Sequence, residues 1–422
     1  MNMVHSEIAY DLAPFIRTYK DGSIERLFGS SMVPASEDPA KSRGGALTRD
    51  VVIDQETGVS ARLFLPSRAA TGKRLPLVIY IHGGAFCTES AFCRTYHRYA
   101  TSLAACSGAL VVSVEYRLAP EHPIPTAYHD AWAALRWVST LTDPWIATYA
   151  DTGRAFLAGD SAGANIAYHT AVRASREGGV LDILGLIMVQ PFFWGPEWLP
   201  SEKLWDGVAV FQPSRVDLLW PCITAGRAGN DDLRINPPKA EIASLTCRHV
   251  LVAVAQKDTL VDRGRRLAAH MSCSPWIGGN VTLVESEDED HGFHLFSPLR
   301  ATSKKLMEAI AQFIYKPQHA ALSESEHKRC WRIESYRRAL SVPTRPFMRQ
   351  PPTTADMEVN NGPSFMAPAA SLMIGHGKSF NRFSGRVRNE KGNVNPFSAT
   401  LVGSFGMKHF LEVASLRSGA GW

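Results

Sequence analysis

The sequence lacks a long uninterrupted apolar run and a leader-like start. No apolar run reaches the roughly 18 residues that indicate a membrane-spanning helix, which argues against a membrane span. The first 20 residues mix His5, Glu7, Asp11 and Arg17 among apolar residues. They therefore contain no apolar core of the kind that a secretory signal needs.

Cysteine is scarce and scattered. The seven cysteines are odd in number, and no CxxC pair occurs among them. Disulfide frameworks and zinc sites use paired cysteines at characteristic spacings, so we expect neither, and no metal or organic cofactor is implied. Without a secretory signal, this cysteine usage favours a reducing compartment. We therefore expect a cytoplasmic protein.

Positive charge is concentrated in the last quarter of the chain. The net charge is +5, yet residues 317–422 hold 14 basic and 7 acidic side chains, while the first 316 residues hold 31 and 33. The same stretch is rich in Pro, Gly, Ser and Asn and has no sustained periodicity, which is typical of disorder. We predict a disordered basic tail over 317–422 and no nucleic-acid partner. A nucleic-acid role for the basic stretch 378–391 is the alternative.

Short apolar runs rich in β-branched residues alternate with helical patterns before this tail. Continuous apolar runs suit strands that are covered on both faces, and strand–helix alternation favours a mostly parallel sheet with helices on both sides. The sequence therefore predicts the α/β class. The expected strands are 77–81, 110–114, 155–158, 184–189, 250–255 and 281–285, and the expected helices are 127–141, 162–176, 262–271 and 299–314.

Two irregular segments interrupt the alternation. Residues 1–45 show no clear period, and an insertion rich in Trp, Pro and Gly follows the strand expected at 184–189. Insertions at this place in α/β enzymes cover substrates. We predict an N-terminal lid segment at 1–45 and a cap insertion at 194–245 within a catalytic domain at 46–316, at least one of which covers a pocket. Ordinary surface loops and short helices are the alternative.

The strongest chemical signal is the run Gly159-Asp160-Ser161-Ala162-Gly163, between an expected strand and an expected helix. This is the G-x-S-x-G pattern of a nucleophile elbow in its strand–turn–helix context. The tight turn strains the serine backbone, and small neighbours remove clashes with chain segments that pack closely around it. The helix N-terminus favours developing negative charge. Ser161 is the predicted nucleophile.

A second signal is the HGGAF run at 82–86, directly after the strand expected at 77–81. Acyl transfer builds an oxyanion that preorganised N–H donors stabilise. We predict that the amides of Gly83, Gly84 and Ala162 form this oxyanion hole. We expect His82 to shape the loop by hydrogen bonding instead of acting as a base. A plain turn that ends a strand is the alternative.

A serine nucleophile needs a general base and a group that orients it, and in the elbow-bearing folds the chain order is Ser, Asp or Glu, then His. Asp258 follows an expected strand, and His291 lies before the last expected helix. The predicted triad is Ser161, Asp258 and His291. Asp262 and His294 are the alternative acid and base. The acidic run before His291 is a solvated loop or a source of negative charge that raises the pKa of this histidine.

The segment EYRLAPEHP, at 115–123, has a structural interpretation. Arg117 and Glu121 are expected to form an ion pair that braces the loop behind the oxyanion hole, and the prolines stiffen the turn.

These motifs together resemble the hormone-sensitive-lipase branch of the α/β-hydrolases: HGGAF, EYRLAPEHP, GDSAG and the placement of Asp258 and His291. Further motifs resemble the plant carboxylesterases, a subfamily that also contains gibberellin receptors and 2-hydroxyisoflavanone dehydratases. They are FCTESAF (86–92), AGDSAGANIA (158–167), RINP (234–237) and EDHGFHLF (289–296).

The resemblance covers the chain up to about residue 316 and implies an α/β-hydrolase fold with a cap, and activity on short-chain esters. The leading hypothesis is a serine carboxylesterase, a monomer or homodimer whose partner is a small ester. A dehydratase that uses the same residues is the alternative. A hormone receptor fits less well, because receptors of this subfamily replace the histidine that His291 retains. Aromatic residues of the insertion either favour an apolar or aromatic substrate group or fill the core of the cap: Phe192, Phe193, Trp194, Trp198 and Trp205.

Overall fold

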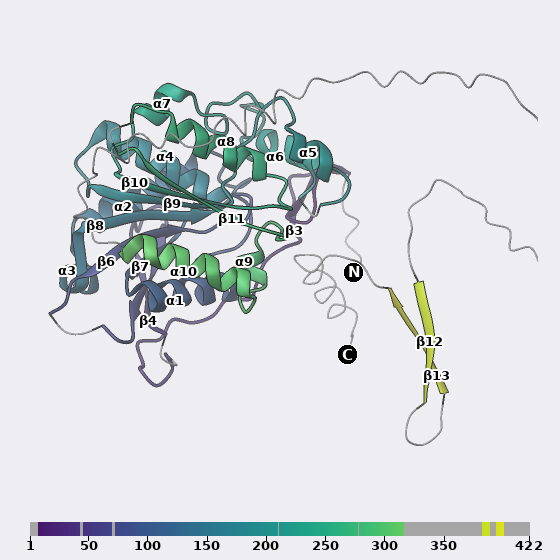
Figure 1. The fold of residues 1–422 in the computed structure, drawn as a ribbon, viewed down its shortest axis with the longest axis horizontal. Helices are drawn as coiled ribbons and strands as arrows, with labels where there is room; N and C mark the ends of the chain where they lie inside the picture. The colour runs from purple at the N-terminus through teal and green to yellow at the C-terminus, as the bar shows by residue number, and fades with distance from the viewer. Residues whose placement is uncertain are drawn as a thin grey trace, which may run out of the picture. The chain divides into compact units, whose positions relative to one another are not determined.

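An eight-stranded sheet organises the chain in the computed structural model, which describes residues 7–42, 45–69, 72–209, 211–276, 278–315, 382–388 and 394–400 (Figure 1). The strand order is β11-β10-β9-β8-β6-β7-β5-β4. The six strands from β11 to β7 run parallel, whereas β5 pairs antiparallel with both β7 and β4. The strands are β4 (Ala46–Val52), β5 (Ser60–Pro66), β6 (Leu75–Ile81), β7 (Leu110–Glu115), β8 (Ala150–Asp160), β9 (Ile183–Val189), β10 (His249–Ala255) and β11 (Asn280–Ser286).

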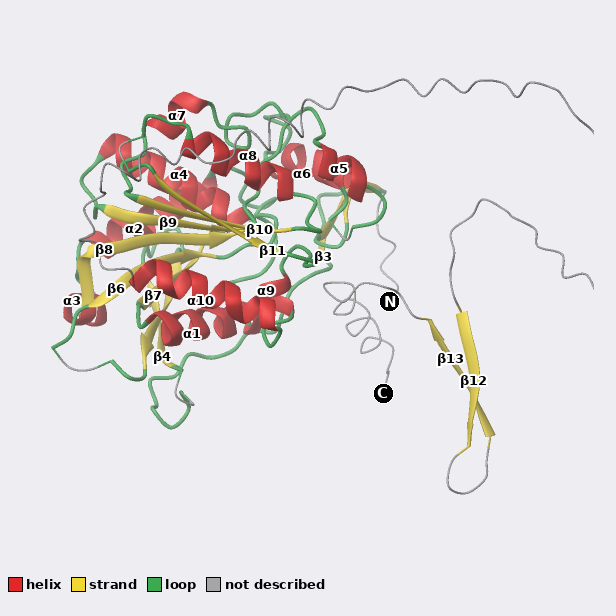
Figure 2. Cartoon of the chain, viewed as in Figure 1, coloured by secondary structure: helices red, strands yellow, loops and turns green. Residues whose placement is uncertain are grey.

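Helices cover both faces of this sheet (Figure 2). On one face, α1 packs against α10, and on the other α4 contacts β6, β8 and β9 while α2 packs on α4 and α8 on β10 and β11. The predicted α/β-hydrolase architecture is confirmed, including all six expected strands and four expected helices. The helices are α1 (Arg94–Ser107), α2 (Thr126–Ser139), α3 (Pro144–Tyr149), α4 (Ala162–Glu177), α8 (Val261–Ser272), α9 (Phe293–Phe296) and α10 (Ala301–Tyr315).

The sequence did not predict α1 or the antiparallel strands β4 and β5. The buried stripe of α1 consists of tyrosines and small residues, with Leu103 as its one large aliphatic side chain. In β4, buried or half-buried positions alternate with exposed ones only in part, as expected for a strand at the edge of the sheet. Neither α1 nor β4 has the continuous aliphatic run that identified the central strands.

The N-terminal segment and the insertion both form structure over the same end of the fold. The N-terminal segment is a three-stranded antiparallel sheet of β1 (Ile8–Leu12), β2 (Ile16–Tyr19) and β3 (Ile24–Arg26). The insertion contributes α5 (Pro200–Trp205), α6 (Pro213–Ile223) and α7 (Lys239–Ala243). Strand β1 contacts α6, so the N-terminal segment and the insertion meet. Proline begins both α5 and α6, where its missing N–H costs nothing.

Tryptophans stabilise the insertion through hydrogen bonds to carboxylates. One carboxylate, that of Asp217, accepts hydrogen bonds from the indole N–H of Trp194 and of Trp198, both at 2.8 Å. Trp220 is fully buried, and its indole donates to Asp232 at 3.0 Å. These side chains fit the interpretation in which the aromatic residues fill the core of the cap.

A buried ion pair joins the insertion to a helix of the main sheet's covering layer. The guanidinium of Arg263, on α8, donates to the carboxylate of Glu202, on α5, at 2.6 Å, and both side chains are almost fully buried. The guanidinium also lies over the ring of Trp194. Breaking a buried pair leaves an uncompensated charge, so this contact holds α5 in one place.

The C-terminal stretch contains two strands where none was predicted. β12 (Arg382–Arg388) pairs antiparallel with β13 (Val394–Thr400), within a unit separate from the one that carries the sheet. The rest of 317–422 lies outside the described residues, so disorder there stays a prediction. Within the described part of the chain no helix is long and apolar enough to cross a membrane. The cysteines described there are all free.

Candidate active site

Ser161 lies in a strained turn between β8 and α4. Its backbone has φ 51° and ψ −119°, which is rare for a residue with a side chain and persists only where surrounding contacts impose it. Its amide donates to the carbonyl of Val189 at 2.9 Å, and its carbonyl accepts from the amide of Phe192 at 3.0 Å. A Cβ on Gly163 would collide with the carbonyl oxygen of Ile81. The close approach of β6 to the turn therefore requires glycine here, as predicted.

Three residues from separate loops meet at the carboxyl ends of the strands. The Nε2 atom of His291 lies 3.0 Å from Ser161 Oγ, and its Nδ1 lies 2.8 Å from Asp258 Oδ2. The other oxygen of Asp258 accepts from the amide of Leu260 at 2.9 Å. Asp258 is 1% exposed. This geometry is that of nucleophile, base and orienting acid in a serine hydrolase.

Gln190, which the sequence analysis did not identify, holds the loop of His291 on both sides. Its side-chain amide donates to the carbonyl of Asp290 at 3.1 Å and accepts from the amide of Gly292 at 2.8 Å. Gln190 is buried and has φ 47°. No motif in the sequence indicates this role. In the structure, the positive φ of a non-glycine residue directly after β9 marks the position as strained.

The alternative acid and base lie elsewhere. The carboxylate of Asp262, on α8, accepts from the amide of Ser201 at 2.9 Å and faces Arg265. His294 is buried, its ring packs edge-on against Tyr99, and burial lowers its pKa to about 3. Neither residue is hydrogen-bonded to Ser161 or His291 in the described residues.

The pKa of His291 is raised above its ordinary value of 6.5. Burial alone lowers it, but the nearby carboxylates of Asp258, Asp290 and Asp160 together outweigh burial because they favour the charged imidazolium. Asp290 belongs to the acidic run before the histidine, so the predicted influence of that run on the pKa is present.

The loop after β6 differs from prediction at Gly83. Its amide donates to Tyr96 Oη at 2.9 Å and to Asp160 Oδ1 at 3.1 Å, so this donor points into the protein and is not free for an oxyanion. The amides of Gly84, Ala85 and Ala162, by contrast, have no hydrogen-bond acceptor within the described chain. The Gly83 amide points inward because the carboxylate of Asp160 is buried and needs hydrogen-bond donors.

Asp160 is the centre of a buried polar network that joins the elbow to this loop. Its carboxylate accepts from Tyr80 Oη at 2.5 Å, from Tyr96 Oη at 2.8 Å and from the Gly83 amide. Burial raises the pKa of Asp160. A satisfied buried network of this kind specifies one arrangement, so the second residue of GDSAG determines how the HGGAF loop lies.

His82 is a structural member of the same loop. Its ring is stacked on Tyr116 with centroids 4.3 Å apart, and its Nδ1 lies 2.8 Å from the carbonyl of Gly83. Complete burial lowers its pKa to about 4, so the ring is neutral at physiological pH. This environment suits loop shaping, the role expected of it.

The predicted ion pair between Arg117 and Glu121 is wrong. Arg117 binds Asp130, on α2, at 2.7 Å, and Glu121 binds Arg26, on β3, at 2.7 Å. Asp130 is 2% exposed, and its burial requires a full charge partner. Arg26 also donates to the carbonyl of Cys87 at 2.9 Å, so the loop behind the oxyanion hole is tied to the N-terminal segment.

Comparisons with known proteins identify the family of the chain. The family model for the α/β-hydrolase fold matches residues 78–295. The chain is 42% identical to 2-hydroxyisoflavanone dehydratase of Glycyrrhiza echinata over 73% of this chain and 96% of that protein. It is 36% identical to probable carboxylesterase 2 of Arabidopsis thaliana, over 74% and 98%.

Among solved structures, a thermostable carboxylesterase from a metagenomic library, EstE1, matches with a TM-score of 0.57 at 29% identity, over 65% of this chain and 93% of that chain. The resemblance in motifs, the fold and the relatives coincide in the same part of the chain. The chain therefore belongs to the α/β-hydrolase family, in the group that contains the plant probable carboxylesterases and 2-hydroxyisoflavanone dehydratases.

Proposed function

We propose that this protein is a serine carboxylesterase that hydrolyses short-chain or aromatic carboxylic esters. The observation that carries the proposal is the continuous chain of hydrogen bonds from Ser161 through His291 to Asp258. The strained backbone of the serine supports it, because such strain concentrates at functional sites. Relatives named carboxylesterases are a second, independent support.

The mechanism follows from the roles that the distances allow. Ser161 Oγ attacks the ester carbonyl while His291 Nε2 takes its proton, and the resulting imidazolium then protonates the leaving alcohol. Asp258 holds the proton on Nδ1 and stabilises the imidazolium. Water, activated by the same histidine, then hydrolyses the acyl-enzyme and restores the free serine.

The oxyanion of each tetrahedral intermediate needs N–H donors. We assign these to the amides of Gly84, Ala85 and Ala162. Ala85 takes the role that the motif suggested for Gly83, because the Gly83 amide already donates to Tyr96 and Asp160. Ala85 has φ 54°, and Ala162 is the first residue of α4. One such donor contributes about 2.7–4 kcal/mol to transition-state stabilisation.

A fluorophosphonate probe tests the nucleophile directly. We expect it to label the protein once per chain, to add its mass to the peptide that contains Ser161, and to abolish hydrolysis of p-nitrophenyl acetate in proportion to labelling. The measurement is intact-protein and peptide mass spectrometry beside the ester assay. Labelling of another serine with equal loss of activity would contradict the assignment.

The pH dependence tests the base. His291 acts as a base only when neutral, and its pKa is raised; kcat/KM for a neutral ester should therefore fall as pH decreases, with a midpoint above 6.5. The charged and titratable groups that face this ring are Asp258, Asp290, Asp160 and His294. An acidic limb centred below 6.5 would show that burial outweighs the carboxylates.

Dehydration of a 2-hydroxyisoflavanone is the second candidate function. The relative from Glycyrrhiza echinata with that name is 42% identical to this chain, more than the Arabidopsis relative described above. His291 would serve as the base that removes a proton, and the same amides would stabilise the developing oxyanion. Supplying 2-hydroxyisoflavanone and measuring loss of water separates the two. Efficient dehydration beside feeble ester hydrolysis would favour the lyase.

A further inference from the structure

The segment from Val189 to Phe192, at the end of β9, holds the backbone around Ser161. The amide of Ser161 donates to the carbonyl of Val189 at 2.9 Å, and its carbonyl accepts from the amide of Phe192 at 3.0 Å. Between these two residues, the amide of Gln190 donates to the carbonyl of Ala253, on β10, at 2.7 Å. The backbone of this segment is therefore fixed relative to both the nucleophile elbow and the neighbouring strand.

The side chain of Gln190 extends from this segment to the loop that carries His291. It donates to the carbonyl of Asp290 at 3.1 Å and accepts from the amide of Gly292 at 2.8 Å, so it binds the residues immediately before and after the base. Ser161 and His291 are 130 positions apart in the chain. One short segment nevertheless holds the nucleophile through the backbone and the base through a side chain.

The two hydrogen bonds of Gln190 demand a particular kind of side chain. One backbone group of the loop is a donor and the other is an acceptor, so the side chain between them must accept from one and donate to the other. A carboxamide does both at once, whereas an ionised carboxylate only accepts. Gln190 is 2% exposed, so a group that lost its partner here would stay unpaired at a cost in free energy. Its φ of 47° is a further cost, which only the surrounding contacts sustain.

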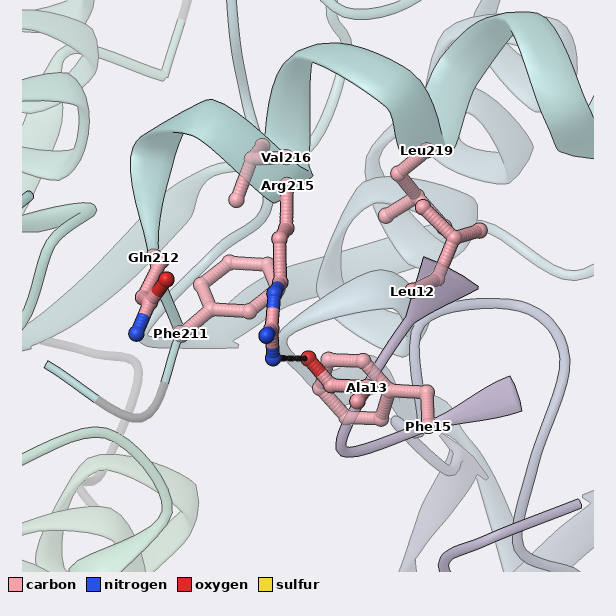
Figure 3. A pocket seen from close by; sticks show the side chains of 8 residues that line it. All are labelled: Leu12, Ala13, Phe15, Phe211, Gln212, Arg215, Val216 and Leu219. Atoms are coloured by element: carbon pink, nitrogen blue, oxygen red, sulfur yellow. Dashed lines mark hydrogen bonds between the residues drawn. The ribbon is translucent and has the colours of Figure 1, made fainter. Parts of the chain in front are cut away.

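A ring contact orients the imidazole of His291 but does not set its distance from the nucleophile. The ring of Phe211 is stacked on the imidazole, with centroids 5.5 Å apart and planes at 21°. Phe211 packs edge-on against Phe15, beside the hydrogen bond from Arg215 to the carbonyl of Ala13 (Figure 3). Stacked rings tolerate a lateral offset, so this contact fixes the plane of the imidazole and leaves its place within that plane to the loop.

We propose that Gln190 is a positioning residue, which sets the distance between His291 Nε2 and Ser161 Oγ by tying the loop of the base to the segment that holds the nucleophile. This inference rests on the proposed esterase function. The proton moves through His291 in both acylation and deacylation, so both steps depend on the same distance. A misplacement of about 1 Å lowers a rate by about 10²-fold. Because Gln190 acts through the base, its effect is the same for every acyl group.

Three substitutions test this role. Gln190→Met keeps the length of the side chain and removes both hydrogen bonds. Gln190→Glu keeps the shape but donates only while the carboxyl is uncharged. Gln256→Met is the matched control. The side chain of Gln256 binds the same loop, where it accepts from the amide of Asp288 at 3.1 Å, but it is exposed and its partner lies three residues before His291.

For Gln190→Met we expect kcat for p-nitrophenyl acetate to fall about 10- to 100-fold. Stopped-flow measurement of the p-nitrophenol burst should show that acylation and deacylation are both slower. The ratios of kcat/KM among p-nitrophenyl acetate, butyrate and hexanoate should stay unchanged, because the base serves all three esters. Gln256→Met should keep an activity near that of the unmodified protein. Thermal unfolding of each variant shows whether the fold persists.

The Gln190→Glu variant adds a measurement that a merely structural role would not move. While uncharged, the introduced carboxyl makes both hydrogen bonds, but once ionised it faces the carbonyl of Asp290 without a proton to donate. Burial raises the pKa of such a carboxyl. The ratio of its kcat/KM to that of the unmodified protein should therefore be highest near about pH 6 and fall toward that of Gln190→Met as pH rises. The titratable groups that face the base are present in both proteins: Asp258, Asp290, Asp160 and His294.

Several results would overturn the positioning role: unchanged kcat in Gln190→Met, altered ratios among the three esters, an equal loss in Gln256→Met, or a pH-independent ratio for Gln190→Glu. If Gln190→Met does not fold, the pH dependence of Gln190→Glu decides alone. If the unmodified protein neither hydrolyses these esters nor reacts with a fluorophosphonate, the proposed function itself fails and this inference fails with it. An active unmodified protein with an indifferent Gln190 overturns the inference alone.

Discussion

Replacing Ser161 with alanine is expected to lower kcat for p-nitrophenyl acetate by about 10⁴-fold or more. The variant loses the attacking oxygen but keeps the amide donors and the binding surface, which leave only a residual acceleration. The side chain of Ser161 contacts His291 and carries none of the backbone bonds that hold the turn. The fold should therefore persist, and thermal unfolding of the variant should match that of the unmodified protein.

Ser175→Ala is the matched control for this substitution. Ser175 lies on the same helix, 14 residues further on, which corresponds to about 21 Å along an α-helix. Its hydroxyl donates to the carbonyl of Ala171 at 2.9 Å. Activity near that of the unmodified protein is expected for this variant. Hydrolysis that survives Ser161→Ala but not inhibition by a fluorophosphonate would mean that another nucleophile is at work.

Replacing Asp258 with asparagine is expected to lower kcat by about 10⁴-fold while leaving the geometry intact. An amide at this position no longer fixes the proton on His291 Nδ1, so the ring can adopt the tautomer in which Nε2 carries a proton and cannot act as a base. The same change removes a carboxylate that raises the pKa of His291. The acidic limb of the residual activity should therefore move to lower pH.

Asp262→Asn is the matched control, four residues further along the chain. This carboxylate contacts Ser201 and Arg265 and makes no contact with His291. The control should keep most of its activity, with a small loss of stability from the contact to the cap. The measurement is the pH profile of kcat for both variants. A greater loss of kcat in Asp262→Asn than in Asp258→Asn would make Asp262 the orienting acid.

Much of the candidate site was predictable because its signals are local. The GDSAG run has small residues around its serine because neighbouring chain segments pack closely around a tight turn of this kind. The structure accordingly places Gly163 against Ile81. The central strands were predictable since each is a continuous apolar run buried on both faces. The order of Ser161, Asp258 and His291 along the chain was enough to propose a triad.

The failed predictions share a physical cause, which is competition from partners outside the motif. Arg117 and Glu121 are four residues apart, yet Asp130 and Arg26 pair with them. A buried carboxylate recruits whichever donors the fold brings near it. In the same way Asp160, 77 residues from Gly83, takes the amide that the motif alone assigned to the oxyanion.

The sequence by itself determined the fold class and was enough to propose Ser161, His291 and Asp258 as nucleophile, base and acid, because these inferences depend on local patterns and on chain order. Only the tertiary structure decided which amides are free, that Gln190 holds the loop of His291, and that Phe211 lies on its ring. Those facts depend on contacts between residues far apart in the chain, 77 positions for Gly83 and Asp160, 80 for Phe211 and His291, and 102 for Gln190 and Gly292. A buried polar group without a partner costs free energy, so burial favours the contacts that pair such groups. This preference acts only once folding has brought the distant segments together.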